Sequence, residues 1–211
     1  SPRGSINDSL RSADSFVILS PQQGYSSSEI AGLQAFTGAG GHLLLAGEPP
    51  SQGGSVTSLL GIVAPTGGAD PLNSVAGPFG MSFSDGYVYN LEEYDNNYRN
   101  VYAQPTDSSF ANTDSQVTVH EATKVSGGDA LLETGPSTKL SSDREAKAYP
   151  VAAQSGEVVA IGDSSIFNSE WVQRGDNEEF VSSVVEYLVN SDKTPGEPAK
   201  PEGPERPTAG M

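Results

Sequence analysis

The stretch "DSFVILSPQQGYSSSEIAGLQAFTGAGGHLLLAGE", residues 14–48, predicts three elements in a row. The β-branched and aromatic run at 16–19 ends at a Ser-Pro turn and predicts a strand. Ser26 and Glu29 have capping-box spacing, which predicts a helix that ends at the glycine-rich stretch that follows. The continuous apolar run at 43–45 predicts a second strand, buried on both faces. Together they predict a βαβ unit on a parallel sheet.

The rest of the chain indicates a return to this sheet after a long polar region. Residues 64–150 are rich in Gly, Asn, Asp, Ser and Tyr, and their short alternating runs predict β-strands and loops inserted into the α/β layer. A short helix is expected at 55–63, a hairpin at 149–163 with its turn at Ser155-Gly156, and a last amphipathic helix at 176–189. The expected sheet centre is Phe16, Ile18, Leu44, Val159 and Ile161, with Trp171 anchoring the loop after "GDSS".

The opening βαβ pattern resembles that of the class I glutamine amidotransferase-like superfamily. The later stretch "GEVVAIGDSSIFNSEWVQRGDNEEFVSSVVEYLV", 156–189, resembles the closing strand, loop and helix of its DUF4350-type members. The resemblance implies a flavodoxin-like, three-layer α/β/α sandwich with a mostly parallel sheet. It also implies a haloarchaeal protein in which this domain lies between two membrane segments. True amidotransferases of the superfamily use a Cys nucleophile, and this chain has no cysteine, so their chemistry is not carried over.

The chain is strongly acidic. Eleven Lys and Arg residues against 27 Asp and Glu residues give a net charge of −16. Such a surface repels nucleic-acid phosphates and anionic lipid, so we expect neither as a partner. Scarce lysine, abundant acidic residues and the lack of cysteine are typical of proteins from extreme halophiles. The lack of cysteine also excludes disulfides, thiolate metal sites and a cysteine nucleophile.

Polar residues follow three of the predicted parallel strands. Ligands of parallel α/β sheets gather at the carboxyl ends of the strands, so these residues predict a small polar ligand site. The alternative is a tight turn in which the aspartate and serines bond to backbone N–H groups. A second alternative is a serine hydrolase that uses Ser164 with Asp163 and His120. The candidate ligand-binding residues are Ser20, Glu48, Asp163, Ser164 and Ser165.

A tyrosine-rich stretch, 86–102, is the second candidate. Tyr beside Asn and Asp suits carbohydrate or protein surfaces, because the ring offers flat apolar area and the polar groups offer hydrogen bonds. The alternative is a small sheet with tyrosines packed alternately inside and outside. Residues 95–97 offer hard oxygen ligands for a calcium loop, but the alternating acidic spacing is absent and Arg99 lies within the pattern, so we expect no metal there. The candidate recognition residues are Tyr89, Tyr94, Asn97, Tyr98 and Arg99.

The organisation that follows is one α/β domain over residues 1–193 and a proline-rich tail over 194–211. The tail carries Pro at every third position, which predicts a polyproline II stalk. Asn7 begins an N-glycosylation sequon. We expect a non-catalytic, extracytoplasmic binding or scaffolding domain, tethered to the cell membrane by segments outside this chain. We expect no cofactor and no membrane insertion by this chain, and a protein or carbohydrate partner at the cell surface.

Overall fold

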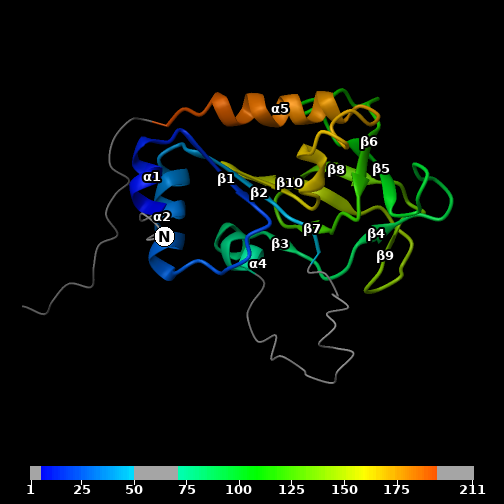
Figure 1. Cartoon of the computed structure of the whole chain (residues 1–211), viewed down its shortest axis with the longest axis horizontal. Helices are drawn as coiled ribbons and strands as arrows, with labels where there is room; N and C mark the ends of the chain where they lie inside the picture. The colour runs from blue at the N-terminus through cyan, green and yellow to red at the C-terminus, as the bar shows by residue number, and fades with distance from the viewer. Residues whose placement is uncertain (1–5, 50–70, 194–211) are drawn as a thin grey trace, which may run out of the picture.

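The computed structural model describes residues 6–49 and 71–193 (Figure 1). Its helices are α1 (Ile6–Ser12), α2 (Ser27–Gly38), α4 (Pro71–Ala76) and α5 (Asn177–Val189), with 3-10 turns η1 (Gly77–Phe79) and η2 (Ser165–Phe167). Its strands are β1 (Ser15–Leu19), β2 (His42–Ala46), β3 (Ser82–Phe83), β4 (Val88–Tyr89), β5 (Asn100–Pro105), β6 (Val117–His120), β7 (Val125–Ser126), β8 (Asp129–Thr134), β9 (Lys139–Leu140), β10 (Pro150–Ser155) and β11 (Val158–Ile161). The helix expected at 55–63 and the tail at 194–211 lie outside the described residues.

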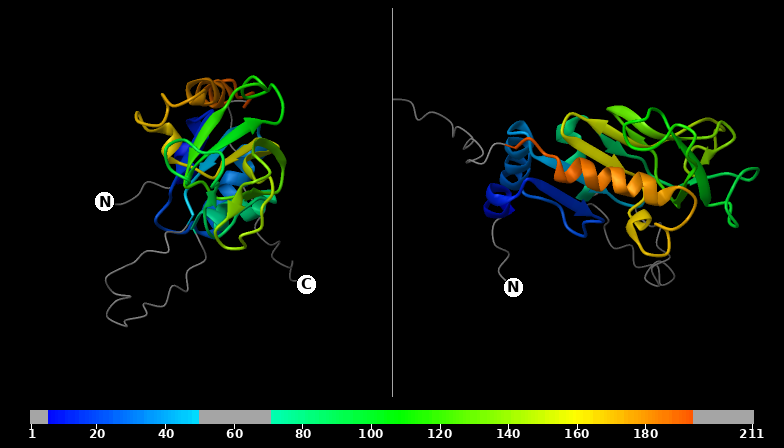
Figure 2. Two further views of the ribbon diagram at one scale, coloured as in Figure 1. Left: turned by 90° about the vertical axis from the view of Figure 1, so that its right-hand side faces the viewer. Right: turned by 90° about the horizontal axis from the view of Figure 1, so that it is seen from above.

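Seven strands form one curled, mixed sheet in the order β1-β2-β11-β10-β8-β5-β6. Strands β1, β2 and β11 are parallel. Every other pairing in the sheet is antiparallel, from β11 with β10 to β5 with β6. The ribbon closes into a half-barrel with few helices around it (Figures 1 and 2). The expected three-layer, flavodoxin-like α/β/α sandwich with a mostly parallel sheet is therefore wrong.

The error lies in the region 64–150, which was expected as an insertion. Its described part supplies β5, β6 and β8, and these strands form one side of the main sheet. Burial in β6 is continuous over Val117–Val119, as it would be in a buried parallel strand. A hydrophobic pattern indicates which residues are inside, but it does not contain the direction of the partner strand. That direction depends on long-range pairs such as Ala153 of β10 with Ala130 of β8.

The opening βαβ unit is confirmed. Strands β1 and β2 pair in parallel, with Val17 opposite Leu44. The capping box at the start of α2 is complete, because the Ser26 hydroxyl accepts from the Glu29 N–H at 3.3 Å and the Glu29 carboxylate accepts from the Ser26 N–H at 2.8 Å. The β10–β11 hairpin also turns at Ser155-Gly156, as expected.

Side chains on the two faces of the parallel strands belong to two separate apolar clusters. Leu44, Val159 and Ile161 pack beneath α5, against Phe180 and its neighbours. Alternate residues of the same strands face the other way and pack against α1, α2 and α4. Strand side chains alternate between the two faces of a sheet, so each strand contributes to both clusters. The residues of the second cluster include Leu10, Leu33, Phe36, Leu43, Leu45 and Val158.

Lys193 fixes the end of the described chain to its beginning. This lysine is buried, and its ammonium donates to the carbonyl oxygens of Leu10 at 2.8 Å and Arg11 at 3.2 Å and to that of Ala13. These carbonyls belong to the last turn of α1 and the residue after it, where a helix leaves acceptors unpaired and favours a cation. The residues that lead into and out of the described fold therefore lie together at the amino ends of β1 and β2 (Figure 1).

Candidate functional site

Three of the five strand-end residues come together at the carboxyl ends of β1, β2 and β11. The hydroxyls of Ser20 and Ser164 lie 2.9 Å apart. The Ser164 hydroxyl also donates to a Glu48 carboxylate oxygen at 3.2 Å. Parallel strands bring their carboxyl ends to one edge, which explains why residues 144 positions apart in the chain meet here.

Asp163 and Ser165 point into the fold instead. The Asp163 side chain is fully buried, and one oxygen accepts from the Ser165 N–H at 2.8 Å and its hydroxyl at 2.6 Å. The other oxygen accepts from the backbone N–H of His120 at 2.8 Å. Burial raises the pKa of Asp163 to about 6, although these hydrogen bonds oppose the rise. Asp163 thus joins the turn after β11 to strand β6. Its bonds to backbone N–H groups are those expected from the alternative interpretation of this stretch as a tight turn.

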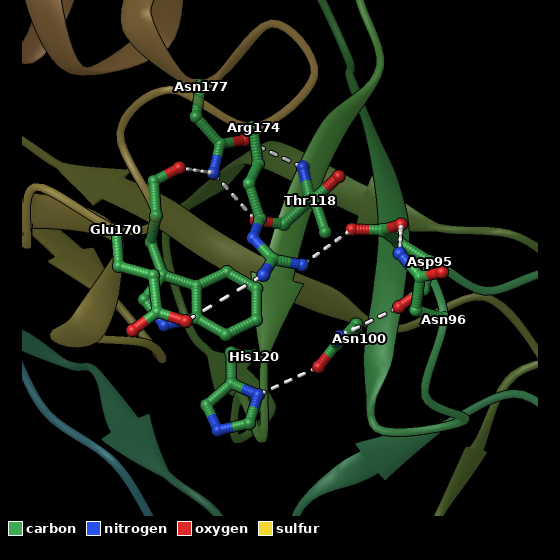
Figure 3. Close-up of polar contacts among 9 residues, drawn as sticks. Asp95, Asn96, Asn100, Thr118, His120, Glu170, Arg174 and Asn177 are labelled. Carbon is green, nitrogen blue, oxygen red and sulfur yellow. Dashed lines mark hydrogen bonds and ion pairs between the residues drawn. The ribbon is translucent and has the colours of Figure 1, made fainter.

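The whole outer edge of β6 is closed in this way. The Gln116 N–H donates to Asp176 at 2.7 Å, and the Thr118 N–H donates to Asn177 at 2.7 Å. The Asn177 amide returns a bond to the Thr118 carbonyl at 2.9 Å (Figure 3). Because the Asp163 carboxylate accepts from the His120 N–H, every second N–H from Gln116 to His120 is bonded to a side chain. Asp176 is the N-cap residue of α5, but its carboxylate bonds to this strand and not to the helix.

The His120 imidazole is engaged with groups other than the serines. Its imidazole Nδ1 lies 2.8 Å from the Asn100 side-chain oxygen (Figure 3), and its ring stacks on Trp171 with centroids 4.4 Å apart. Among the described residues, neither ring nitrogen forms a hydrogen bond with a serine. The arrangement needed for a serine nucleophile activated by His120 is therefore not assembled in this structure.

The tyrosine-rich stretch forms an aromatic cluster around Arg99. The Tyr89 and Tyr98 rings meet edge to face with centroids 6.2 Å apart. The Arg99 guanidinium lies 4.8 Å from the centroid of Tyr87 and pairs with the Glu121 carboxylate. Hydrogen bonds to Glu121 and Tyr98 raise the pKa of Arg99 above its ordinary value. Tyr89, Tyr98 and Arg99 of the predicted recognition set are thus brought together.

Tyr94 and Asn97 are not part of that cluster. Tyr94 pairs through its backbone with Val101, and the Asn97 side chain accepts from the Arg99 N–H at 3.1 Å. The neighbouring Asp95 carboxylate accepts from Arg174 at 2.9 Å (Figure 3). The Asp95 carboxylate and the Asn97 side-chain oxygen of a conceivable calcium loop are therefore engaged with protein donors. Within 6–49 and 71–193, no group of three or more His, Cys, Asp or Glu side chains is placed to hold a metal ion.

A cleft of about 550 Å³ connects the strand-end cluster with the aromatic cluster. Glu48 lines it from the first, and Tyr87 and Arg99 line it from the second. The guanidinium of Arg144 also lines it and forms no ion pair with a described residue. The full lining is Glu48, Pro49, Asp85, Gly86, Tyr87, Arg99, Glu121, Ser141, Ser142 and Arg144.

Backbone strain gathers around this cleft. Four described residues other than glycine have a left-handed φ. Three of them lie at the cleft or beside it, namely Ser20 at 39°, Glu121 at 47° and Arg144 at 60°. Such conformations cost of order 1–3 kcal/mol each and concentrate at functional sites. Gly86 on the cleft wall has a φ of 84°, and a Cβ there would lie 2.5 Å from the Ser141 hydroxyl oxygen. The strain supports a functional reading of this cleft.

Sequence reasoning found only Glu48 and Arg99 of the ten residues that line the cleft. Asp85 and Glu121 come from two separate loops, Ser142 and Arg144 come from a third, and no motif connects the three loops. Tyr87 could have been found from the sequence, because it belongs to the tyrosine-rich stretch 86–102. It was not among the candidate recognition residues. Asn7 of the sequon lies in helix α1. None of the described helices is long and apolar enough to cross a membrane.

The domain is thus a curled mixed sheet with a polar cleft at the carboxyl ends of its parallel strands. The family model "Domain of unknown function (DUF4350)" matches residues 3–185, so the chain belongs to that family. The expected amidotransferase-like, flavodoxin-like (Rossmann-like) sheet is corrected by the fold, because most strand pairs in the sheet are antiparallel.

The chain is similar to solved structures of other proteins. The mmIFT52 N-terminal domain is 14% identical, with a TM-score of 0.65, and the match covers 88% of this chain and 81% of that one. This likeness shows a shared fold. The alpha-L-fucosidase isoenzyme 2 from Paenibacillus thiaminolyticus is 17% identical, with a TM-score of 0.48 over 84% of this chain and 26% of the enzyme. No curated protein matches the chain.

Proposed function

We propose that this chain is a non-catalytic binding domain that holds a hydroxyl-rich ligand, of the carbohydrate class, in the cleft between the strand-end and aromatic clusters. The observation that carries the proposal is the lining of the cleft. Tyr87 offers an aromatic side chain, Glu48 and Asp85 offer acceptors for ligand hydroxyls, and Arg144 offers a guanidinium that has no ion pair within 6–49 and 71–193. Sites that fix a small ligand combine apolar surface with a few convergent polar groups in this way.

Arg144 is the best residue with which to test the site. Its side chain is exposed, so replacing it leaves the core intact. We expect wild-type protein to bind a uronate-containing tetrasaccharide, and Arg144→Gln to weaken this binding about tenfold, which is the loss of one charged hydrogen bond. Arg11→Gln on α1 removes the same charge at the far end of the parallel strands and should bind like wild type.

Isothermal titration calorimetry with that tetrasaccharide and with neutral chitotetraose checks the prediction. Binding of both sugars with equal loss in Arg144→Gln would place the arginine against hydroxyls, and not against a carboxylate. Failure of wild-type protein to bind either sugar at millimolar concentration would reject the carbohydrate class.

The alternative of a serine hydrolase makes the opposite prediction about Ser164. Its hydroxyl bonds to Ser20 and Glu48, and His120 is bonded elsewhere. We expect no turnover of a panel of acyl and aryl esters above the rate without protein, and no change in Ser164→Ala. Turnover by wild-type protein that disappears in Ser164→Ala would establish the hydrolase.

The proposal extends to where the domain works. A net charge of −16 on 211 residues is typical of proteins adapted to molar salt. We propose that the domain belongs to a haloarchaeon and lies outside its cytoplasm, tethered to the membrane by other segments.

Self-repulsion should destabilise the fold at low ionic strength. The screening length falls from about 30 Å at 0.01 M to about 3 Å at 1 M salt, so the melting temperature should rise markedly between these KCl concentrations. A melting temperature that is flat or falls with KCl contradicts the halophilic origin.

A further inference from the structure

The two edges of the main sheet differ in whether their outward backbone groups are hydrogen-bonded. An edge strand exposes a row of N–H and C=O groups that can pair with another chain. At the β6 edge, Asp163, Asp176 and Asn177 occupy successive outward N–H groups. At the β1 edge, no described residue bonds to the outward groups. One edge is thus closed by side chains, and the other is left open.

The register identifies which groups of β1 are open. The His42 N–H bonds to the Asp14 carbonyl at 3.2 Å, and the Ser20 N–H bonds to the Ala46 carbonyl at 2.8 Å. In a parallel ladder, alternate residues bond to the same neighbour, so Phe16 and Ile18 also face β2. The N–H and C=O groups of Ser15, Val17 and Leu19 therefore point away from the sheet.

The side chains beside this edge are apolar and exposed. Val17 and Leu19 are 43% and 49% exposed, and they stand on the face of the sheet that α5 covers. Val185 and Val189 of α5 are 50% and 69% exposed. These valines and partly buried Val181 follow one flank of the helix, at four-residue spacing.

That flank of α5 overhangs β1. The opposite flank carries Tyr187, whose ring stacks on His42 with centroids 4.0 Å apart. His42 in turn bonds to Glu157, which precedes β11, so Tyr187 lies toward the interior of the sheet. The valine flank must then face the β1 edge, where β1 lies beside α5 in the view from above (Figure 2, right). The open strand edge and the valines form one apolar strip.

Acidic side chains surround the strip. Glu178 lies on the valine flank of α5, Glu186 lies above it on the solvent side, and Asp14 precedes β1; all three are exposed. A second copy of the chain would bring equal acidic rims together, on top of a net charge of −16 for each molecule. A partner segment that alternates apolar and basic residues would cover the strip and neutralise its rim.

We propose that β1 is a docking edge for an extended segment of a partner protein, in which apolar residues alternate with Lys or Arg. The segment adds a strand to the sheet, and its backbone pairs with Ser15, Val17 and Leu19. Its apolar side chains face Val181 and Val185, and strand addition of this kind takes affinity from the backbone and specificity from alternate side chains. This surface is separate from the cleft and does not depend on the ligand proposed for it.

The test uses the full chain and the synthetic peptide acetyl-KVKVKVK-amide. Val17→Pro removes one outward N–H but no bond to β2, and proline is tolerated at such edge positions. Val17→Thr retains the N–H and the β-branched shape. We expect Val17→Pro to weaken peptide binding about tenfold or more and Val17→Thr to weaken it less than about threefold. Circular dichroism and melting temperature check that both variants fold.

Two controls separate strand addition from charge attraction. Acetyl-KKKVVVK-amide has the same composition without alternation, and it should bind at least about tenfold more weakly. Hydrogen exchange should slow at Val17 and Leu19 in the complex with the alternating peptide. Equal binding of both peptides, equal binding by Val17→Pro and wild type, or a wild-type dimer in light scattering that Val17→Pro dissociates would each overturn the proposal.

Discussion

Truncating Ile161 to Ala is expected to lower the free energy of unfolding by about 2–5 kcal/mol, with the result near the upper end of that range. Ile161 is fully buried in β11, beneath α5. Its partners in the register are Ala46 of β2 and Ala152 of β10. Alanines on both sides cannot expand into the vacated space, and the cost of such a truncation grows with the cavity that remains.

Urea unfolding in molar KCl measures this loss, and Val17→Ala provides the matched control. Val17 stands on the same face of the same sheet but is exposed, so its truncation should cost less than about 1 kcal/mol. An Ile161→Ala variant as stable as Val17→Ala would mean that the inner face of the parallel strands is assigned wrongly.

The elements with local signals could be predicted from the sequence. The capping box at Ser26, the turn at Gly156 and the apolar run of β2 each depend on residues close in the chain, and each is confirmed. Trp171, expected to be a semi-buried anchor, is buried, and of the five residues expected at the sheet centre only Phe16 is partly exposed. Helix α1 was missed, because seven residues with one buried leucine carry little periodic signal.

Pairing between distant strands could not be predicted in the same way. Antiparallel β10, β8 and β5 pair through contacts between distant residues, which no single segment of the sequence indicates. The family resemblance at the two ends of the chain implied a mostly parallel sheet instead. The cleft had the same difficulty, since Glu48, Arg99 and Arg144 come from three loops. Of the five residues predicted to form a polar cluster at the strand ends, Ser20, Glu48 and Ser164 do meet, because their meeting needs only the direction of three strands. The other two, Asp163 and Ser165, point into the fold.

The stability of the fold should also respond to the protonation of Asp163. Burial raises the pKa of this carboxyl from 3.8 to about 6, so the folded protein holds the proton more tightly than the unfolded chain. The contribution of Asp163 is therefore complete below about pH 3.8 and is lost as the pH rises through 6. A difference of about 2.2 pKa units at 1.36 kcal/mol each amounts to about 3 kcal/mol.

Asp163→Asn isolates this effect from the other titrating groups. Asparagine has the same shape but no proton to gain, so the variant should lack the stabilisation that wild-type protein acquires on acidification. We expect the difference in unfolding free energy between wild type and Asp163→Asn to grow by about 2 kcal/mol between pH 7 and pH 4.5, in favour of wild type. The asparagine amide must also meet the N–H of His120 or Ser165, a clash of donors that should destabilise the variant at both pH values.

Denaturant unfolding at the two pH values, in one molar KCl concentration, provides the measurement. Ser165→Ala is the control, because it removes one donor to Asp163 but keeps the carboxyl and its burial, so its difference from wild type should change far less with pH. If the difference for Asp163→Asn stays constant from pH 7 to 4.5, the carboxyl does not hold a proton in the folded state at pH 4.5. Asp163 would then be an ordinary ionised carboxylate that closes the edge of β6, and acid stability would have to come from the remaining surface charge.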